Sequence, residues 1–154
     1  MEICSYVTGF VDGEGSFLVS FSKRKKMRTG IEVRPAFTVS QHERSRGILE
    51  FLQRFFRCGT TRFNKSDRTW KYEVRSLDDL FERVIPHFER YPLQTSKHSD
   101  FECFRDICWM MRKGAHLETE GIHHIVDLAY GMNNVGARRF DKNRLLRDAR
   151  EMKV

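Results

Sequence analysis

The sequence predicts an α+β domain built around an antiparallel sheet. Two pairs of segments alternate between apolar and polar residues, which is the period of a β-strand, and a short polar turn joins the members of each pair. Segments whose apolar residues recur at helical spacing precede, separate and follow these pairs. No glycine- and serine-rich linker and no internal repeat interrupts this order, so we expect the elements α-β-β-α-β-β-α-α-α in one domain.

The first half of this order begins with a short helix over residues 6–12, for which Ser5 is the expected N-cap and two nearby glycines mark the end. Strands are expected over residues 16–22 and 31–40, where the apolar residues alternate with polar ones. The basic residues 23–28 lie between these strands, which predicts an antiparallel hairpin with a basic tip.

The second half begins with an amphipathic helix over residues 43–57 and a second hairpin of strands over 61–64 and 69–75. Three helical segments follow: residues 77–85 with a disturbance near Pro86, residues 96–112 and residues 119–130. We place the domain over residues 1–137 and expect a basic helix or tail over residues 138–154.

The composition indicates the class of partner. The 154 residues include 28 Lys and Arg against 21 Asp and Glu, a net charge of +7, which favours a polyanion and most often nucleic acid. The longest apolar run, residues 107–111, is far shorter than the roughly 20 residues of a membrane span, which argues against a membrane protein. The N-terminus lacks the pattern of a signal peptide and the four cysteines are scattered, so we expect an intracellular protein of the cytoplasm, nucleoid or an organelle that is not secreted.

Small residues mark one face of the first helix. Gly9 and Gly13 are four positions apart, so both lie on that face and would let another backbone approach closely. In the alternative, Gly9 only relieves crowding inside the monomer and Gly13 is a simple C-cap.

Two acidic residues lie where the same helix ends. Asp12 and Glu14 add negative charge to the negative end of the helix dipole, which is unfavourable unless a cation is nearby. A hard cation such as Mg²⁺ would resolve the conflict, because it binds carboxylates, water and phosphate oxygens. In the alternative, both acids are solvated turn residues.

Residues 6–17, YVTGFVDGEGSF, resemble the signature of the LAGLIDADG homing endonucleases, in which a helix ends in an acidic residue between glycines and a strand follows directly. Residues 37–41 look like the end of that family's second strand, and residues 91–97 with Phe101 look like its later lysine segment. Residues 116–133 are similar to a stretch of intron-encoded members. The resemblance implies an αββαββα core with a saddle-shaped antiparallel sheet and additional C-terminal helices.

The resemblance also implies a DNA endonuclease that binds a long pseudo-palindromic duplex site and hydrolyses both strands, leaving 3′ overhangs. Its cofactor would be Mg²⁺, with Mn²⁺ able to substitute and Ca²⁺ binding without supporting cleavage. The implied metal ligands are Glu14, where many relatives have Asp, and the carbonyl of Gly13; the position of Asp12 is usually structural. The implied catalytic residues are Glu14, Gln41 and Lys97, of which Gln41 would order water and Lys97 would offset phosphoryl charge. In the alternative, Gln41 is an ordinary strand-end residue and Lys97 a solvated cation.

The chain contains a single copy of the motif, so it supplies one of two helices that would pack together about a two-fold axis. We therefore expect a homodimer in which one chain alone does not cut. The expected interface residues are Tyr6, Gly9, Phe10, Asp12 and Gly13.

The polar faces of the predicted strands would lie in the major groove of the DNA. Residues on these faces and in the adjoining turns and tail are the expected DNA contacts: Ser20, Ser22, Arg24, Lys26, Arg28, Glu32, Arg34, Thr38, Ser40, Arg62, Asn64, Arg68, Lys71, Glu73 and Arg139. A competing reading is a protein of the same fold that binds nucleic acid without cutting it, either a maturase that binds intron RNA or a repressor. No spacing typical of a zinc site or of a nucleotide-binding P-loop is present.

Overall fold

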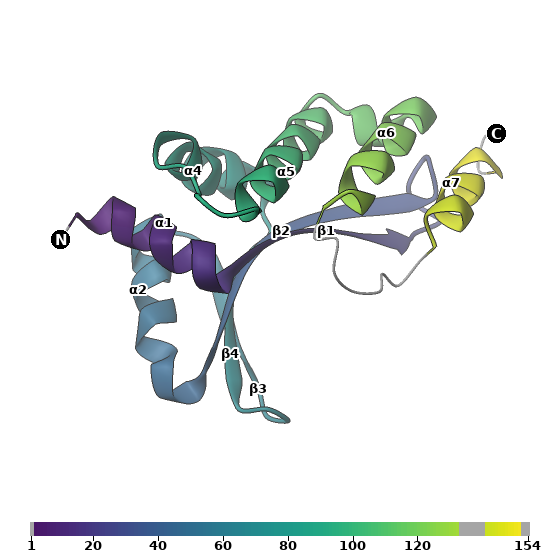
Figure 1. Ribbon diagram of the computed structural model, residues 1–154. Coiled ribbons are helices and arrows are strands. Elements are labelled where there is room, and N and C mark those ends of the chain that lie inside the picture. The colour runs from purple at the N-terminus through teal and green to yellow at the C-terminus, as the bar shows by residue number, and fades with distance from the viewer. Residues whose placement is uncertain (1, 133–140, 152–154) are drawn as a thin grey trace. The chain divides into compact units, whose positions relative to one another are not determined.

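The computed structural model describes residues 2–132 and 141–151 (Figure 1). Its elements follow the predicted order, with additional short turns. They are α1 (Ile3–Glu14), β1 (Gly15–Lys23), β2 (Ile31–His42), η1 (Glu43–Ser45), α2 (Arg46–Phe56), β3 (Thr60–Asn64), β4 (Thr69–Val74), α3 (Leu77–Asp79), η2 (Leu80–Val84), α4 (Ile85–Arg90), α5 (Lys97–Arg112), η3 (Ala115–Leu117), α6 (Thr119–Tyr130) and α7 (Lys142–Glu151). The α+β class with an antiparallel sheet is confirmed.

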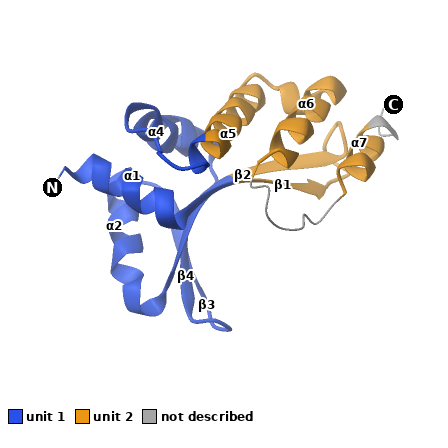
Figure 2. Cartoon of the chain, in the orientation of Figure 1, with its two compact units in different colours: residues 1–17, 36–98 blue, residues 18–35, 99–154 orange. Residues whose placement is uncertain are grey.

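The chain divides into two compact units, which Figure 2 colours separately. The first contains residues 1–17 and 36–98, and the second contains residues 18–35 and 99–154. The predicted boundary between residues 137 and 138 lies outside the described residues.

The strands form one sheet in the order β1-β2-β4-β3. Strand β4 is antiparallel to both β2 and β3, and its Lys71 is opposite Ser40 on one side and Arg62 on the other. The polar residues of three strands therefore form a row across the sheet.

Helix α1 is longer than predicted at both ends. Glu2, not Ser5, is its N-cap, because the Glu2 carboxylate accepts hydrogen bonds from the backbone N–H groups of Cys4 and Ser5. The helix ends after Glu14, where Gly15 becomes extended and donates its N–H to the carbonyl of Val11. A Cβ atom at residue 15 would lie 2.7 Å from Cγ1 of Val11, so this close turn from helix to strand requires glycine.

The core of the first unit is largely aromatic. The ring of Phe37 lies 5.3 Å from that of Phe17, 5.6 Å from that of Phe56 and 5.7 Å from that of Phe88, and all four side chains are buried. Tyr72 is also buried, and its hydroxyl donates to the carbonyl of Cys58 over 2.8 Å. The aromatic residues on the apolar sides of β2 and β4 are thus buried in this core, as their spacing predicts.

The predicted helix over residues 43–57 begins with a 3₁₀ turn, and only α2 is α-helical. Two hydrogen bonds hold this turn to neighbouring residues. His42 Nδ1 accepts from the N–H of Arg44, and Glu43 donates its N–H to the carbonyl of Arg68. Burial of Leu49, Leu52 and Phe56 on one face of α2 confirms its amphipathic pattern.

The disturbance expected near Pro86 is a change of helix type. A π-helical segment, η2, leads directly into α4, and Pro86, which has no backbone N–H to donate, lies in the first turn of α4.

In the second unit, α6 packs against α7. An ion pair of 2.6 Å between Lys142 and Asp127 links these helices, and another of 2.6 Å joins Lys23 of β1 to Asp148 of α7. The described part of the basic C-terminal segment is therefore a helix. Cys4, Cys58, Cys103 and Cys108 are free thiols, and within residues 2–132 and 141–151 no helix is long and apolar enough to span a bilayer.

Candidate active site and nucleic-acid surface

One face of α1 is exposed and largely apolar. Ile3 is 51% exposed and Tyr6 38%, Phe10 is half-buried, and Gly9 and Gly13 are exposed. A Cβ added at either glycine would have no atom within 4 Å, and the C-cap of the helix is Gly15. The alternative that Gly9 relieves crowding inside the monomer and Gly13 is a simple cap is therefore wrong.

This apolar face extends onto α2. The ring of Tyr6 lies 6.4 Å from that of Phe10 and 6.3 Å from that of Phe51 in α2. The sequence reading missed Ile3 and Phe51. The sequence could have indicated Ile3, because it precedes Tyr6 by three positions and would lie on the same helix face, but the helix was predicted to start later. Phe51 had none, because its proximity to Tyr6 depends on tertiary packing.

The opposite face of α1 is fixed to the α4 region. Thr8 donates its hydroxyl to the carbonyl of Tyr91 over 2.9 Å, and the same oxygen lies 3.1 Å from His87 Nε2. The rings of Phe55, Phe56 and Tyr91 surround His87, and burial lowers the pKa of its imidazole to about 4. His87 is therefore neutral near pH 7.

Asp12 is held by the loop that follows α4. Its carboxylate accepts from the N–H of Gln94 over 2.7 Å and from both the N–H and the hydroxyl of Thr95, over 3.2 and 2.6 Å. Burial alone would raise the pKa of Asp12, but the hydrogen bonds from Thr95 and Gln94 outweigh it, so the pKa is lowered. Both carboxylate oxygens are used within the chain, which agrees with the structural position that the resemblance implies for Asp12. Its predicted place at a dimer interface stays a prediction.

Glu14 and Gln41 come together although 26 residues separate them in the sequence. The Nε2 of Gln41, near the end of β2, donates to Oε2 of Glu14 over 3.1 Å, and Glu14 is exposed. Gln41 is therefore more than an ordinary strand-end residue.

Lys97 lies at the same end of α1, although its ammonium contacts backbone. Its Nζ donates to the carbonyls of Val11 and Asp12 over 2.8 and 2.9 Å. The alternative in which Lys97 is a solvated cation is wrong.

The donors present fit half of a divalent-metal site. Glu14 offers an exposed carboxylate and Gly13 an adjacent carbonyl, which are oxygen ligands of the kind that Mg²⁺ binds. Over the described residues, however, no group of three or more His, Cys, Asp or Glu side chains could hold a metal. A second set of donors would have to come from substrate, water or another copy.

In the first unit, a hollow on the sheet surface is lined by residues of β2, the β3–β4 hairpin and its turn: Ser40, Arg62, Phe63, Asn64, Lys65, Asp67, Thr69 and Lys71. Four of the predicted DNA contacts, Ser40, Arg62, Asn64 and Lys71, are among them. Another predicted DNA contact, Glu73, is outside this lining. Its carboxylate accepts from Arg75 over 2.6 Å, and this bond lowers the pKa of the Glu73 carboxyl.

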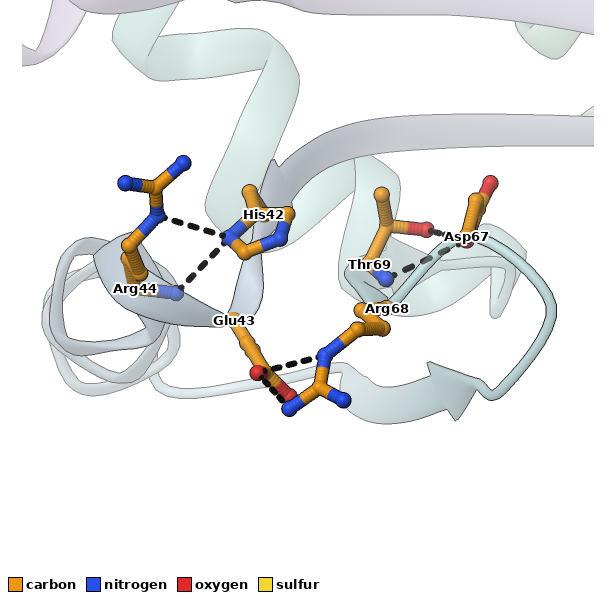
Figure 3. A network of polar contacts seen from close by, with 6 residues as sticks. All are labelled: His42, Glu43, Arg44, Asp67, Arg68 and Thr69. Atoms are coloured by element: carbon orange, nitrogen blue, oxygen red, sulfur yellow. Dashed lines mark hydrogen bonds and ion pairs between the residues drawn. The ribbon is translucent and has the colours of Figure 1, made fainter.

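One predicted DNA contact of this unit, Thr38, is corrected, and a second, Arg68, is paired within the chain and stays a prediction. Thr38 is only 6% exposed, although Ser40 on the same face of β2 is exposed, so Thr38 is not an exposed contact. The guanidinium of Arg68 is bound by the carboxylate of Glu43, as Figure 3 shows, and Asp67 accepts from the N–H and hydroxyl of Thr69. Arg68 therefore fixes the hairpin turn to the end of β2.

In the second unit, several predicted DNA contacts pair with one another or with nearby residues. Glu32 accepts from Ser22 over 3.2 Å and pairs with Arg24 over 3.3 Å, and Arg28 pairs with Glu118 over 2.6 Å. Ser20 donates to the carbonyl of Arg34, while Lys26 and Arg34 are exposed. Arg139 lies outside the described residues.

A cation stacked near the site was not predicted. The guanidinium of Arg46 lies 3.9 Å from the ring centroid of Trp70, and Trp70 is opposite Gln41 in the sheet register. Such stacking supports the strand that carries Gln41.

Comparison with known proteins places these features in a family. A model of the family described as LAGLIDADG endonuclease matches residues 7–108. The chain is 32% identical over 130 residues to the probable intron-encoded endonuclease 2 of Neurospora crassa, with 84% of this chain aligned. It spans only 29% of that relative's length.

Solved structures give the same result. The homing endonuclease I-TnaI is 40% identical with a TM-score of 0.85, and the comparison covers 97% of each chain. The archaeal intron-encoded homing endonuclease I-Vdi141I, solved in complex with DNA, is 26% identical with a TM-score of 0.89, covering 97% of this chain and 96% of that one. Together with the helix-to-strand motif that presents Glu14, these matches establish that the chain belongs to the LAGLIDADG endonuclease family.

Proposed function

We propose that the chain is one subunit of a homodimeric, metal-dependent homing endonuclease that cuts both strands of a long pseudo-palindromic DNA site and leaves 3′ overhangs. The observation that carries this proposal is the combination, in one helix, of an open glycine face and a terminal Glu14 held by Gln41. The family supports DNA cleavage as the reaction, and the complex of I-Vdi141I with DNA supports a duplex substrate.

The dimer is built on the exposed face of α1. Gly9 and Gly13 let a second α1 approach closely, and Ile3, Tyr6 and Phe10 supply apolar surface that association would remove from water. Two-fold symmetry places the same residues on both sides and brings the two Glu14 carboxylates together. The chain also matches 45% of the length of I-SmaMI, as one copy should match half of a protein with two such units.

Glu14 and the carbonyl of Gly13 of each copy would hold Mg²⁺ at this junction, with Mn²⁺ as a substitute and Ca²⁺ as a non-productive ligand. When bound, the metal would stabilise the attacking water and the leaving 3′ oxygen. Gln41 orients the Glu14 carboxylate through Nε2, and its carbonyl oxygen can accept a hydrogen bond from the nucleophilic water.

The polar sheet surfaces bind the DNA. In the first unit, Ser40, Arg62, Asn64 and Lys71 can form hydrogen bonds with base edges in the major groove. In the second, the exposed Lys26 and Arg34 can contact DNA, and Arg144 and Arg147 bind phosphates. A DNA substrate also fits the predicted intracellular location.

The test is a selection of cleaved sites from randomised duplex DNA with Mg²⁺, run beside a binding selection with Ca²⁺. We expect double-strand cuts with 3′ overhangs only with Mg²⁺, and none from Glu14→Gln although it still binds. Sequence-specific binding without Mg²⁺-dependent cuts would instead favour the repressor, and selective binding of structured RNA would favour the maturase. Cutting by Glu14→Gln at the parental rate would contradict the catalytic assignment.

A further inference from the structure

The carboxyl end of α1 is held by a lysine from a distant segment. The last carbonyls of a helix lack partners within it and carry partial negative charge. In α1 the ammonium of Lys97 donates to the carbonyl of Asp12 over 2.9 Å and to the carbonyl of Val11, which also accepts from the N–H of Gly15, over 2.8 Å. One side chain thus meets both the hydrogen-bonding and the electrostatic need of this helix end.

The residues just before Lys97 hold the side chain of Asp12. Thr95 donates its N–H and hydroxyl to the Asp12 carboxylate, and the Thr95 hydroxyl oxygen accepts from the N–H of Lys97 over 3.2 Å. The path from Asp12 through Thr95 to Lys97 therefore returns to the carbonyl of Asp12. This closed set of hydrogen bonds, residues 94–97 with Asp12, is called the α1 clamp below.

The α1 clamp lies two residues before the Glu14 carboxylate. The carbonyl of Asp12 and the N–H of Gly13 belong to one planar peptide, so fixing the first orients the second. Gly13 has no side chain, and a Cβ added to it would have no atom within 4 Å, so side-chain packing does not fix this backbone. An ammonium, with three donors at one point, suits two adjacent carbonyl oxygens.

We propose that Lys97 is a positioning residue, which closes the α1 clamp and so fixes the placement of Gly13 and Glu14, and that it does not act directly on the phosphate. This proposal rests on the proposed function, because Glu14 is the metal ligand there. It differs from the direct role that the family resemblance implies for Lys97. A direct role needs the ammonium at the scissile phosphate, whereas the clamp uses two of its three donors on the backbone of its own chain.

The first test needs neither metal nor DNA. Lys97→Met should speed amide hydrogen exchange at residues 12–16 by about tenfold, the effect of losing hydrogen bonds to a charged group. Asp12→Asn should act on the same amides, and the double variant should be less affected than the product of the single effects, because both remove one clamp. Lys97→Arg should restore part of the protection. Lys25→Met, which removes a charge from the exposed hairpin tip, is the matched control and should change nothing there.

The second test separates the two roles in the reaction. With the clamp open, the Mg²⁺ concentration for half-maximal cleavage should rise about 10- to 100-fold, as when a group supporting a metal ligand is lost. Thr95→Ala, which removes the hydroxyl link but keeps Lys97, should show a smaller shift in the same direction and covers the case in which Lys97→Met does not fold. Unchanged exchange in Lys97→Met together with slower cleavage at saturating Mg²⁺ would overturn the proposal. Failure of the wild-type chain to cut any DNA would instead overturn the proposed function, while the exchange experiment would still test the clamp.

Discussion

Gln41 supports Glu14 through a hydrogen bond of 3.1 Å between its Nε2 and Oε2. Replacing it with alanine removes this bond without removing the carboxylate. We expect Gln41→Ala to lower cleavage at limiting Mg²⁺ by about 10- to 100-fold, since groups behind a metal ligand have effects of that size. DNA affinity measured with Ca²⁺ should stay the same. Gln94→Ala is the control, because Gln94 takes part in the α1 clamp through its backbone N–H, while its exposed side chain donates to the carbonyl of Pro92. Equal rates for the two variants would contradict the assignment.

His87 makes the stability of the first unit depend on pH. Burial lowers the pKa of its imidazole from 6.5 to about 4, so the unfolded chain binds a proton at a higher pH than the folded chain does. The stability that neutral His87 contributes is complete above pH 6.5 and is lost as the pH falls toward about 4. Thermal unfolding between these values should show a downward slope with decreasing pH that is reduced in His87→Gln. An identical slope in both proteins would show that other groups cause it.

A larger side chain at Gly9 should leave the fold of the monomer intact but prevent two α1 helices from packing together in a dimer. Nothing lies within 4 Å of an added Cβ, and leucine favours a helix over glycine by roughly 0.5–1 kcal/mol. Gly9→Leu should therefore retain or raise the free energy of unfolding of the monomer, yet give a monomer by light scattering and lose double-strand cleavage. Gly47→Leu on α2, also with open space around its added Cβ, should remain dimeric. A dimeric Gly9→Leu protein would rule out α1 as the interface.

The β3–β4 hairpin is positioned by its turn. Arg68 has φ of 58° in that turn and its guanidinium is bound by Glu43. Because the charge is already paired, Arg68→Ala should leave the salt dependence of DNA binding unchanged, whereas Arg147→Ala, which removes a proposed phosphate contact, should reduce its slope by about 1. Arg68→Ala and Glu43→Ala should each weaken discrimination between sites, with little further loss in the double variant. A reduced salt slope for Arg68→Ala would instead show that its guanidinium contacts the DNA backbone.

Local patterns predict the elements well and their ends less well. The alternation in β1 to β4 and the helical spacing of α2, α5 and α6 survive in the fold because each pattern matches one buried face. The start of α1 was misplaced because Glu2 caps it from outside the predicted segment, and Thr38 was misread because alternation marks a face without showing which of its residues are buried.

The candidate site was predictable only where the motif itself contains the residues. Glu14, Gly9 and Gly13 lie within one short segment, so their relation follows from helix geometry. Two further contacts join distant segments: the hydrogen bond from Gln41 to Glu14 and the hydrogen bonds from Lys97 to the backbone of α1. Both depend on tertiary packing, which residue spacing does not indicate. The resemblance to the family predicted that Gln41 and Lys97 act together with Glu14. The backbone carbonyls that the Lys97 ammonium contacts are known only from the structure.

The molecule as a whole supplies one copy of each catalytic group, so activity should belong to pairs of subunits. Equal amounts of wild-type and Glu14→Gln subunits, mixed under conditions of exchange, form about one quarter wild-type dimers, so double-strand cleavage should fall to about one quarter at constant total protein. Gly9→Leu subunits do not pair, so the same dilution with them should leave about one half. If both mixtures retain one half of the double-strand cleavage, Glu14→Gln subunits do not impair their partners. Each chain would then cut without a second Glu14.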